Sequence, residues 1–275
     1  MSINATFRYQ HIEELPGLVV SEAALTQFSF QPHFHLGYHI GLVTQGVLHQ
    51  TWNNQKYHLT AGQICLMPPG VVHHGTGQGE DIYHLTTFRV TPERLNSSFF
   101  DCEYRGTGHQ LAPIVIEQAS LAQSFIQLKN LFASNNEADQ LHRDSLWTSN
   151  MAELLRIAEK KPQQEENYGL SKQQLTTIRD YCEANLHNKI SLNQLATLSG
   201  LTRFQFIRRF QKQTGLAPHA WLTCLRLERA CASLTSPNAM IADIAADMGF
   251  YDQSHFNRVF KTAYQVAPSQ YRLQA

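Results

Sequence analysis

The hydrophobic and polar positions near the C-terminus repeat themselves. Leu192–Trp221 and Ile241–Tyr271 each contain an apolar-Ala pair (Leu195-Ala196 and Ile244-Ala245), pass through a glycine-centred turn, and continue with two phenylalanines four positions apart. Apolar residues at that spacing share one face of a helix. Each stretch therefore predicts a short helix, a turn that needs a residue with positive φ, and a second amphipathic helix that begins at an Asx or Thr N-cap.

The two copies align residue by residue, with one insertion. Gly200 corresponds to Gly249 at an offset of 49, whereas Phe206 corresponds to Phe256 at an offset of 50. The extra residue therefore lies in the turn of the second copy. We interpret the pair as two tandem helix-turn-helix units that differ in their turns.

The helix face opposite the phenylalanines is polar and basic in both copies. Arg side chains can bond guanine in the major groove, and Asn or Gln can bond adenine. The outward positions are Phe204, Arg208, Gln211 and Lys212 in the first copy, and Ser254, Asn257, Arg258 and Lys261 in the second. The alternative is that these are ordinary solvated helix faces.

Four other stretches also have apolar residues at helical spacing. They are Glu117–Asn135, Asp139–Lys160, Lys172–Leu186 and His219–Leu234. The last one lies between the two repeats and predicts a rigid spacer helix. If it holds the two reading helices about 34 Å apart, one chain meets two successive major grooves, and a shorter separation demands bent DNA.

The N-terminal half has the pattern of short strands. Apolar or alternating runs are broken by Gly, Pro and Asn, and Asn53-Asn54 suits a hairpin turn. The predicted strands are Leu18–Ala24, Tyr38–Thr44, Lys56–Leu59, Gln63–Met67 and Ile82–Arg89. Several short strands with frequent turns predict a sandwich or barrel.

Charge is distributed unevenly along the chain. Residues 168–275 hold 12 Lys and Arg against 6 Asp and Glu, a formal charge of +6, so the zero net charge of the whole chain leaves −6 for the rest. A basic C-terminal domain is what phosphate binding requires.

The sequence also favours a cytoplasmic protein. It has no basic N-terminal segment followed by an apolar run, and no stretch approaches the length of a membrane span, so we expect no membrane partner. The five cysteines, at positions 65, 102, 182, 224 and 231, form no C-x-x-C pair and no disulfide framework. Reduced thiols fit the cytosol.

The repeat resembles the AraC family of bacterial transcription regulators. The resemblance rests on Ser199-Gly200-Leu201-Thr202…Phe206…Arg209-Phe210…Gly215…Pro218 and on Gly249-Phe250…Ser254…Phe256-Asn257-Arg258…Phe260-Lys261…Pro268…Tyr271-Arg272. It covers about 100 residues and implies a seven-helix DNA-binding domain with a linker helix. It implies base contacts from Phe204, Arg208 and neighbours such as Arg203, and from Gln253, Ser254, Asn257 and Arg258. The chain departs from the family at Gln265, where Gly is common, and at Ala267, where Thr is usual.

Histidines are concentrated in the first half, with 11 of the 14 before residue 160. His33-x-His35-x3-His39-x6-Gly46, followed by Gly62-x5-Pro68-x-Gly70-x2-His73, resembles the two motifs of the cupin barrel, with His39 where cupins usually have Glu. If one strand continues through them, His33, His35 and His39 share a face. Four imidazoles would suit a divalent transition metal such as Zn, Fe or Ni. The open alternative is a metal-free pocket for a small organic effector, which is usual in AraC-type regulators.

We therefore expect a multidomain protein: an N-terminal all-β cupin-like barrel followed by helices, and a C-terminal all-α domain with two helix-turn-helix motifs. The expected boundaries are 1–160 for the effector-binding domain, 161–169 for the linker and 170–275 for the DNA-binding domain. Helices within 117–160 either cover the barrel or form a homodimer interface, and the resemblance favours the dimer.

The predicted function is a transcription regulator that binds double-stranded promoter DNA and senses a small effector or a metal ion. RNA polymerase is a further partner if the protein is an activator. The alternative is a metal-dependent cupin enzyme fused to a DNA-binding domain. No additional acid–base pair has interpretable spacing, so we expect no enzymatic activity.

Overall fold

The computed structural model describes residues 5–77, 82–101, 111–134, 139–158, 169–236 and 238–274. The chain forms two compact units: Met1–Phe30 with Leu36–Gln163, and Gln31–His35 with Gln164–Ala275. Apart from Gly169, the expected linker lies outside the described residues. Within the described ranges, no helix is both long and apolar enough to cross a membrane.

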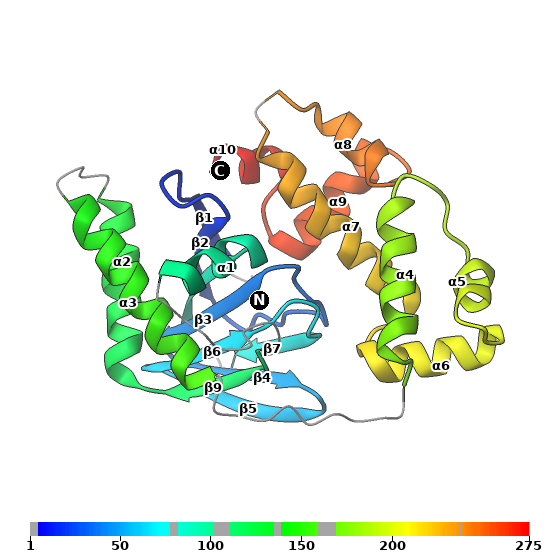
Figure 1. The fold of residues 1–275 in the computed structure, drawn as a ribbon. Helices are drawn as coiled ribbons and strands as arrows, with labels where there is room; N and C mark the ends of the chain where they lie inside the picture. The colour runs from blue at the N-terminus through cyan, green and yellow to red at the C-terminus, as the bar shows by residue number, and fades with distance from the viewer. Residues whose placement is uncertain are drawn as a thin grey trace. The chain divides into compact units, whose positions relative to one another are not determined.

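The first unit contains two antiparallel sheets (Figure 1). The six-stranded sheet has the order β1 (Ala5–His11), β2 (Leu18–Leu25), β8 (Tyr83–Val90), β3 (Tyr38–Gln45), β6 (Gln63–Met67) and β9 (Ile114–Glu117). The three-stranded sheet has the order β5 (Gln55–Thr60), β4 (Val47–Trp52) and β7 (His73–Gly77). All five predicted strands are confirmed within one or two residues at each end.

Strand β6 shows why the core of this unit has two layers. Successive side chains of a strand point to opposite faces. Ile64 and Leu66 join the apolar cluster that also holds the helices of this unit, whereas Cys65 and Met67 join the cluster that includes strands of the second sheet. The larger sheet is thus buried on both faces.

The hairpin turn between β4 and β5 is confirmed. Asn53 and Asn54 have φ values of 49° and 58°, and β4 pairs with β5 in antiparallel register. Asn tolerates the left-handed region better than most residues, and two consecutive positive φ values are what a type I′ turn needs.

In the described part of this unit, three helices accompany the sheets: α1 (Pro92–Asp101), α2 (Ala119–Ala133) and α3 (Gln140–Ala158). The apolar stripes of α2 and α3 are buried in the same cluster as one face of the larger sheet, and they comprise Leu121, Phe125, Leu128, Phe132, Trp147, Met151, Leu154 and Leu155. The stripes therefore cover the sheet. If these helices form a dimer contact, it uses their outer faces, where Leu141 is exposed.

The described part of the second unit has seven helices, the number that the family resemblance implies. They are α4 (Lys172–Ala184), α5 (Leu192–Leu198), α6 (Arg203–Thr214), α7 (Pro218–Leu234), α8 (Ile241–Asp247), α9 (Gln253–Tyr264) and α10 (Pro268–Leu273). Helices α5 and α6 form the first helix-turn-helix motif, α8 and α9 form the second, and α7 lies between them in sequence.

The sequence repeat is also a structural repeat. Phe206 and Phe256 are fully buried, and Gly200 and Gly249 have φ values of 66° and 68°. The N-caps are as expected, because the side chain of Thr202 accepts a hydrogen bond at the start of α6 and Asp252 does so at the start of α9. The turn and cap chemistry of both motifs is confirmed.

Gln265, one of the departures from the family pattern, lies at a backbone position that favours glycine. It ends α9 with a φ of 62°, whereas Gly215 ends α6 with a φ of 76°. A residue with a Cβ atom pays about 1 kcal/mol in this region. Its side chain donates a hydrogen bond to the Thr262 carbonyl oxygen at 2.8 Å.

We expect Gln265→Gly to stabilise the second unit by about 0.5–1 kcal/mol, because glycine removes the left-handed strain. The measurement is hydrogen exchange of the amides in α9 and α10. Gly215→Ala is the matched control and should destabilise by a similar amount. A loss of stability in Gln265→Gly would contradict the prediction and show that the Thr262 hydrogen bond outweighs the strain.

Candidate functional site

The α6 face consists of Arg203, Phe204, Arg208, Gln211 and Lys212, and all five are exposed. Phe206 and Phe210 hold the opposite side of the helix in the core. Phe204 is 74% exposed, which is unusual for a large aromatic residue. Three cations, an amide and an aromatic ring thus occupy one solvent-facing side of a short helix.

The α9 face consists of Gln253, Ser254, Asn257, Arg258 and Lys261. Four of these residues are exposed, but Asn257 is half-buried. The Oδ1 atom of Asn257 is buried, with no hydrogen-bond partner among the described residues. The sequence pattern placed Asn257 outward with the others, because periodicity does not distinguish the centre of a face from its edge.

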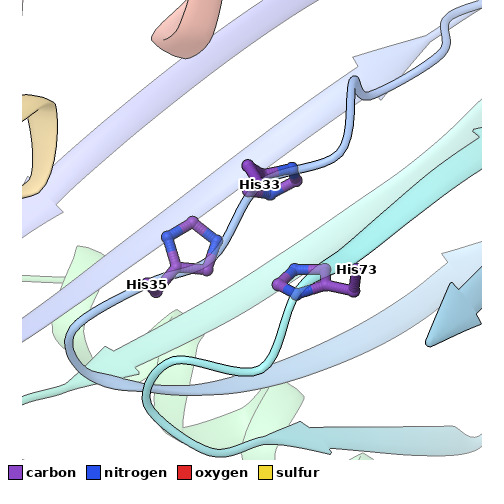
Figure 2. Close-up of side chains that lie close together, drawn as sticks. All are labelled: His33, His35 and His73. Carbon is purple, nitrogen blue, oxygen red and sulfur yellow. The ribbon is translucent and has the colours of Figure 1, made fainter. Parts of the chain in front are cut away.

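The second candidate site is a group of histidines in the N-terminal half. His33 and His35 lie on the segment between β2 and β3, and His73 begins β7 (Figure 2). Each of the three offers a ligand atom, and these atoms lie within 4.8 Å of one another. We call these three residues the histidine cluster.

Local pairing accounts for the approach of these segments. Ser29 pairs with Thr76, and the Phe30 amide donates to the Gly75 carbonyl oxygen at 2.8 Å. The chain that follows Phe30 therefore starts beside β7, only a few residues from His73.

The hydrogen bonds of the cluster set its tautomers. The Nδ1 atom of His33 lies 2.6 Å from the carbonyl oxygen of Gln31. The Nδ1 atom of His73 lies 2.9 Å from the carbonyl oxygen of Val71. A carbonyl oxygen only accepts, so Nδ1 carries the proton and Nε2 keeps its lone pair. This arrangement is typical of histidines that bind a metal through Nε2.

His39 is not part of this group. We expected His33, His35 and His39 to share a strand face, but the chain bends at Leu36 and Gly37, and His39 lies in β3 opposite Met67 and Arg89. A Cβ atom on Gly37 would lie 2.8 Å from the Val90 carbonyl oxygen, so the bend is tightly packed. The continuous strand is wrong, and the structure brings together three of the four predicted ligands.

Glu228 of α7 is a residue that the sequence analysis missed. It is 4% exposed, and its Oε1 atom lies 3.2 Å from His35 Nδ1. Its only sequence signal is its position among the apolar residues of the predicted spacer helix. A buried carboxylate is costly unless it is paired, so its presence there is informative.

The arrangement of two basic, outward-facing helices in tandem helix-turn-helix motifs defines a DNA-binding protein. Comparison with known families agrees. Residues 195–274 match a family described as a helix-turn-helix domain, and residues 15–150 match one described as an AraC-like ligand binding domain. The chain belongs to the AraC family of transcription regulators, with an N-terminal ligand-binding domain and a C-terminal DNA-binding domain.

Individual relatives support the assignment over most of the chain. An uncharacterized HTH-type transcriptional regulator from Haemophilus influenzae is 27% identical over 254 residues, which cover 84% of each chain. The HTH-type transcriptional activator RhaS from Escherichia coli is 26% identical over 265 residues, covering 92% of this chain and 91% of RhaS. These relatives are regulators, which leaves the enzyme alternative without support.

A solved structure shows the same fold. ToxT from Vibrio cholerae, bound to an unsaturated fatty acid, has a TM-score of 0.60 and 15% identity, and the match covers 100% of this chain and 97% of that one.

Proposed function

We propose that this regulator senses a divalent transition metal ion through the histidine cluster, and that the α6 and α9 faces contact bases and phosphates of promoter DNA. The observation that carries the metal proposal is the convergence of three imidazole ligand atoms within 4.8 Å. The donor set supports Zn, Fe or Ni, because neutral imidazole suits each of these ions.

The site fits a sensor because it leaves coordination positions open. Three histidines provide three of the four ligands of a tetrahedral ion, so water or a small anion can complete the sphere. His35 and His73 are buried and His33 is half-buried.

We expect the purified protein to contain about one metal ion per chain, and His33→Ala with His35→Ala to remove it, because one imidazole binds such ions weakly. The measurement is elemental analysis of protein purified without chelator. The matched control is the double change His49→Ala with His58→Ala, which removes another close histidine pair. Unchanged protein without stoichiometric metal would end the proposal and favour a metal-free organic effector.

The assembly of the regulator is the second part of the proposal. We infer a cytoplasmic homodimer on promoter DNA, and activation through RNA polymerase is supported by the relative that is named an activator. Sedimentation at micromolar concentration tests the dimer. A strictly monomeric protein with and without DNA would contradict it.

A further inference from the structure

The starting point is a buried network around Glu228. Residues Gln31–His35 and Gln164–Ala275 form one compact unit, so the network lies within that unit. The Oε1 atom of Glu228 lies 3.2 Å from Nδ1 of His35 and accepts a hydrogen bond from the Tyr264 hydroxyl at 2.8 Å. One carboxylate on α7 thus joins a histidine of the cluster to the last residue of α9.

The other contacts of the segment 31–35 hold it against the same helix. The ring of Phe34 stacks on Trp221 of α7 with centroids 5.6 Å apart. The Cys224 side chain is hydrogen-bonded to the Phe34 backbone, and burial raises the pKa of the Cys224 thiol to about 11. Both contacts fix Phe34, the residue that precedes His35, against α7.

The chemistry of the His35–Glu228 pair is that of a metal ligand with its supporting group. The carboxylate accepts a hydrogen bond from Nδ1–H, which leaves Nε2 as the coordinating atom. His33 and His73 use carbonyl oxygens for the same purpose. His35 has the carboxylate of Glu228 as its acceptor, and a carboxylate both orients the ring and raises its basicity as a ligand.

We propose that Glu228 is the positioning residue for His35 in metal binding, and that it couples metal occupancy to α9 through Tyr264. This inference rests on the proposed metal site. A bound ion strengthens the His35–Glu228 hydrogen bond, and a change at Glu228 alters the hydrogen bond that it shares with the Tyr264 hydroxyl. Because α9 also carries Arg258 and Lys261 of the α9 face, metal binding and DNA binding become linked.

The test uses the full chain with two variants and Zn²⁺ as the probe. Glu228→Gln keeps the size of the side chain and removes the charge, and we expect a 10- to 100-fold loss of Zn²⁺ affinity, measured by competition with a chromophoric chelator. Tyr264→Phe removes only the hydroxyl and keeps the ring that packs on Phe260 and Tyr271. We expect it to bind Zn²⁺ about as tightly as the unchanged protein.

The second readout is the ratio of DNA affinities with and without Zn²⁺. We expect this ratio to differ from 1 in the unchanged protein and to fall close to 1 in Tyr264→Phe. Circular dichroism establishes that each variant is folded, and if Glu228→Gln does not fold, Tyr264→Phe decides the coupling alone.

The outcomes separate the two proposals. If the unchanged protein binds no Zn²⁺, the proposed metal site fails, and this inference fails with it. If it binds Zn²⁺ and Glu228→Gln binds equally well, only the positioning role is overturned. A full Zn²⁺ effect on DNA affinity in Tyr264→Phe would overturn the coupling to α9.

Discussion

Gly249→Ala should destabilise the second unit by about 3 kcal/mol, which sums about 1 kcal/mol of left-handed strain and about 2 kcal/mol of overpacking. A Cβ atom at this position would collide with the Leu186 carbonyl oxygen and the Arg226 guanidinium. That guanidinium donates to the carbonyl oxygens of Leu186 and Asn188 at 2.9 and 3.0 Å. The added methyl group must therefore displace a backbone carbonyl and a half-buried cation together.

The repeat supplies the control for this experiment. Gly200 has nearly the same φ, but a Cβ atom there meets nothing within 4 Å. Gly200→Ala should cost only the strain, about 1 kcal/mol. Hydrogen exchange of the α7–α9 amides reports on this unit alone. Equal losses in the two variants would show that the surroundings of Gly249 relax freely.

Replacing Arg208 or Arg258 by Ala should each weaken specific DNA binding by about 1–3 kcal/mol, or roughly 5- to 150-fold, if the side chains contact bases. Arg208 is exposed on the α6 face and Arg258 on the α9 face. The measurement is fluorescence anisotropy against a duplex selected in vitro for binding to the unchanged protein. It is repeated over a range of salt concentrations and with unrelated duplexes.

The pattern of the loss identifies the contact. A base contact weakens binding to the selected duplex more than to others, whereas a phosphate contact weakens all sequences and reduces the salt slope by about one. Arg179→Ala is the control, since it removes the same charge from the exposed side of α4. Full affinity in both Arg208→Ala and Arg258→Ala would exclude these faces from the interface.

Local chemistry made the second unit predictable from sequence. Helix periodicity, N-caps and glycines act over a few residues, so Thr202, Asp252 and Gly249 could be assigned without any tertiary information. The strands β1, β4, β7 and β9 were not specified individually. Their positions depend on pairing with distant strands, which sequence periodicity alone does not reveal.

The histidine cluster illustrates the same limit. The spacing of His33 and His35 indicated a metal site, and the structure brings these two close to His73. The extension to His39 assumed a continuous strand, and the bend at Gly37 depends on the approach of Val90, a residue more than 50 positions away. Glu228 was missed for the same reason, since its partner is remote in sequence.

The separation of His35 and Glu228 by 193 positions also bears on how the protein folds. Contacts between distant residues require the closure of long loops and slow the folding of a domain. During synthesis, residues 31–35 emerge long before the helix that they pack against. Residues 31–35 therefore cannot reach their final contacts until α7, far later in the chain, has been synthesised.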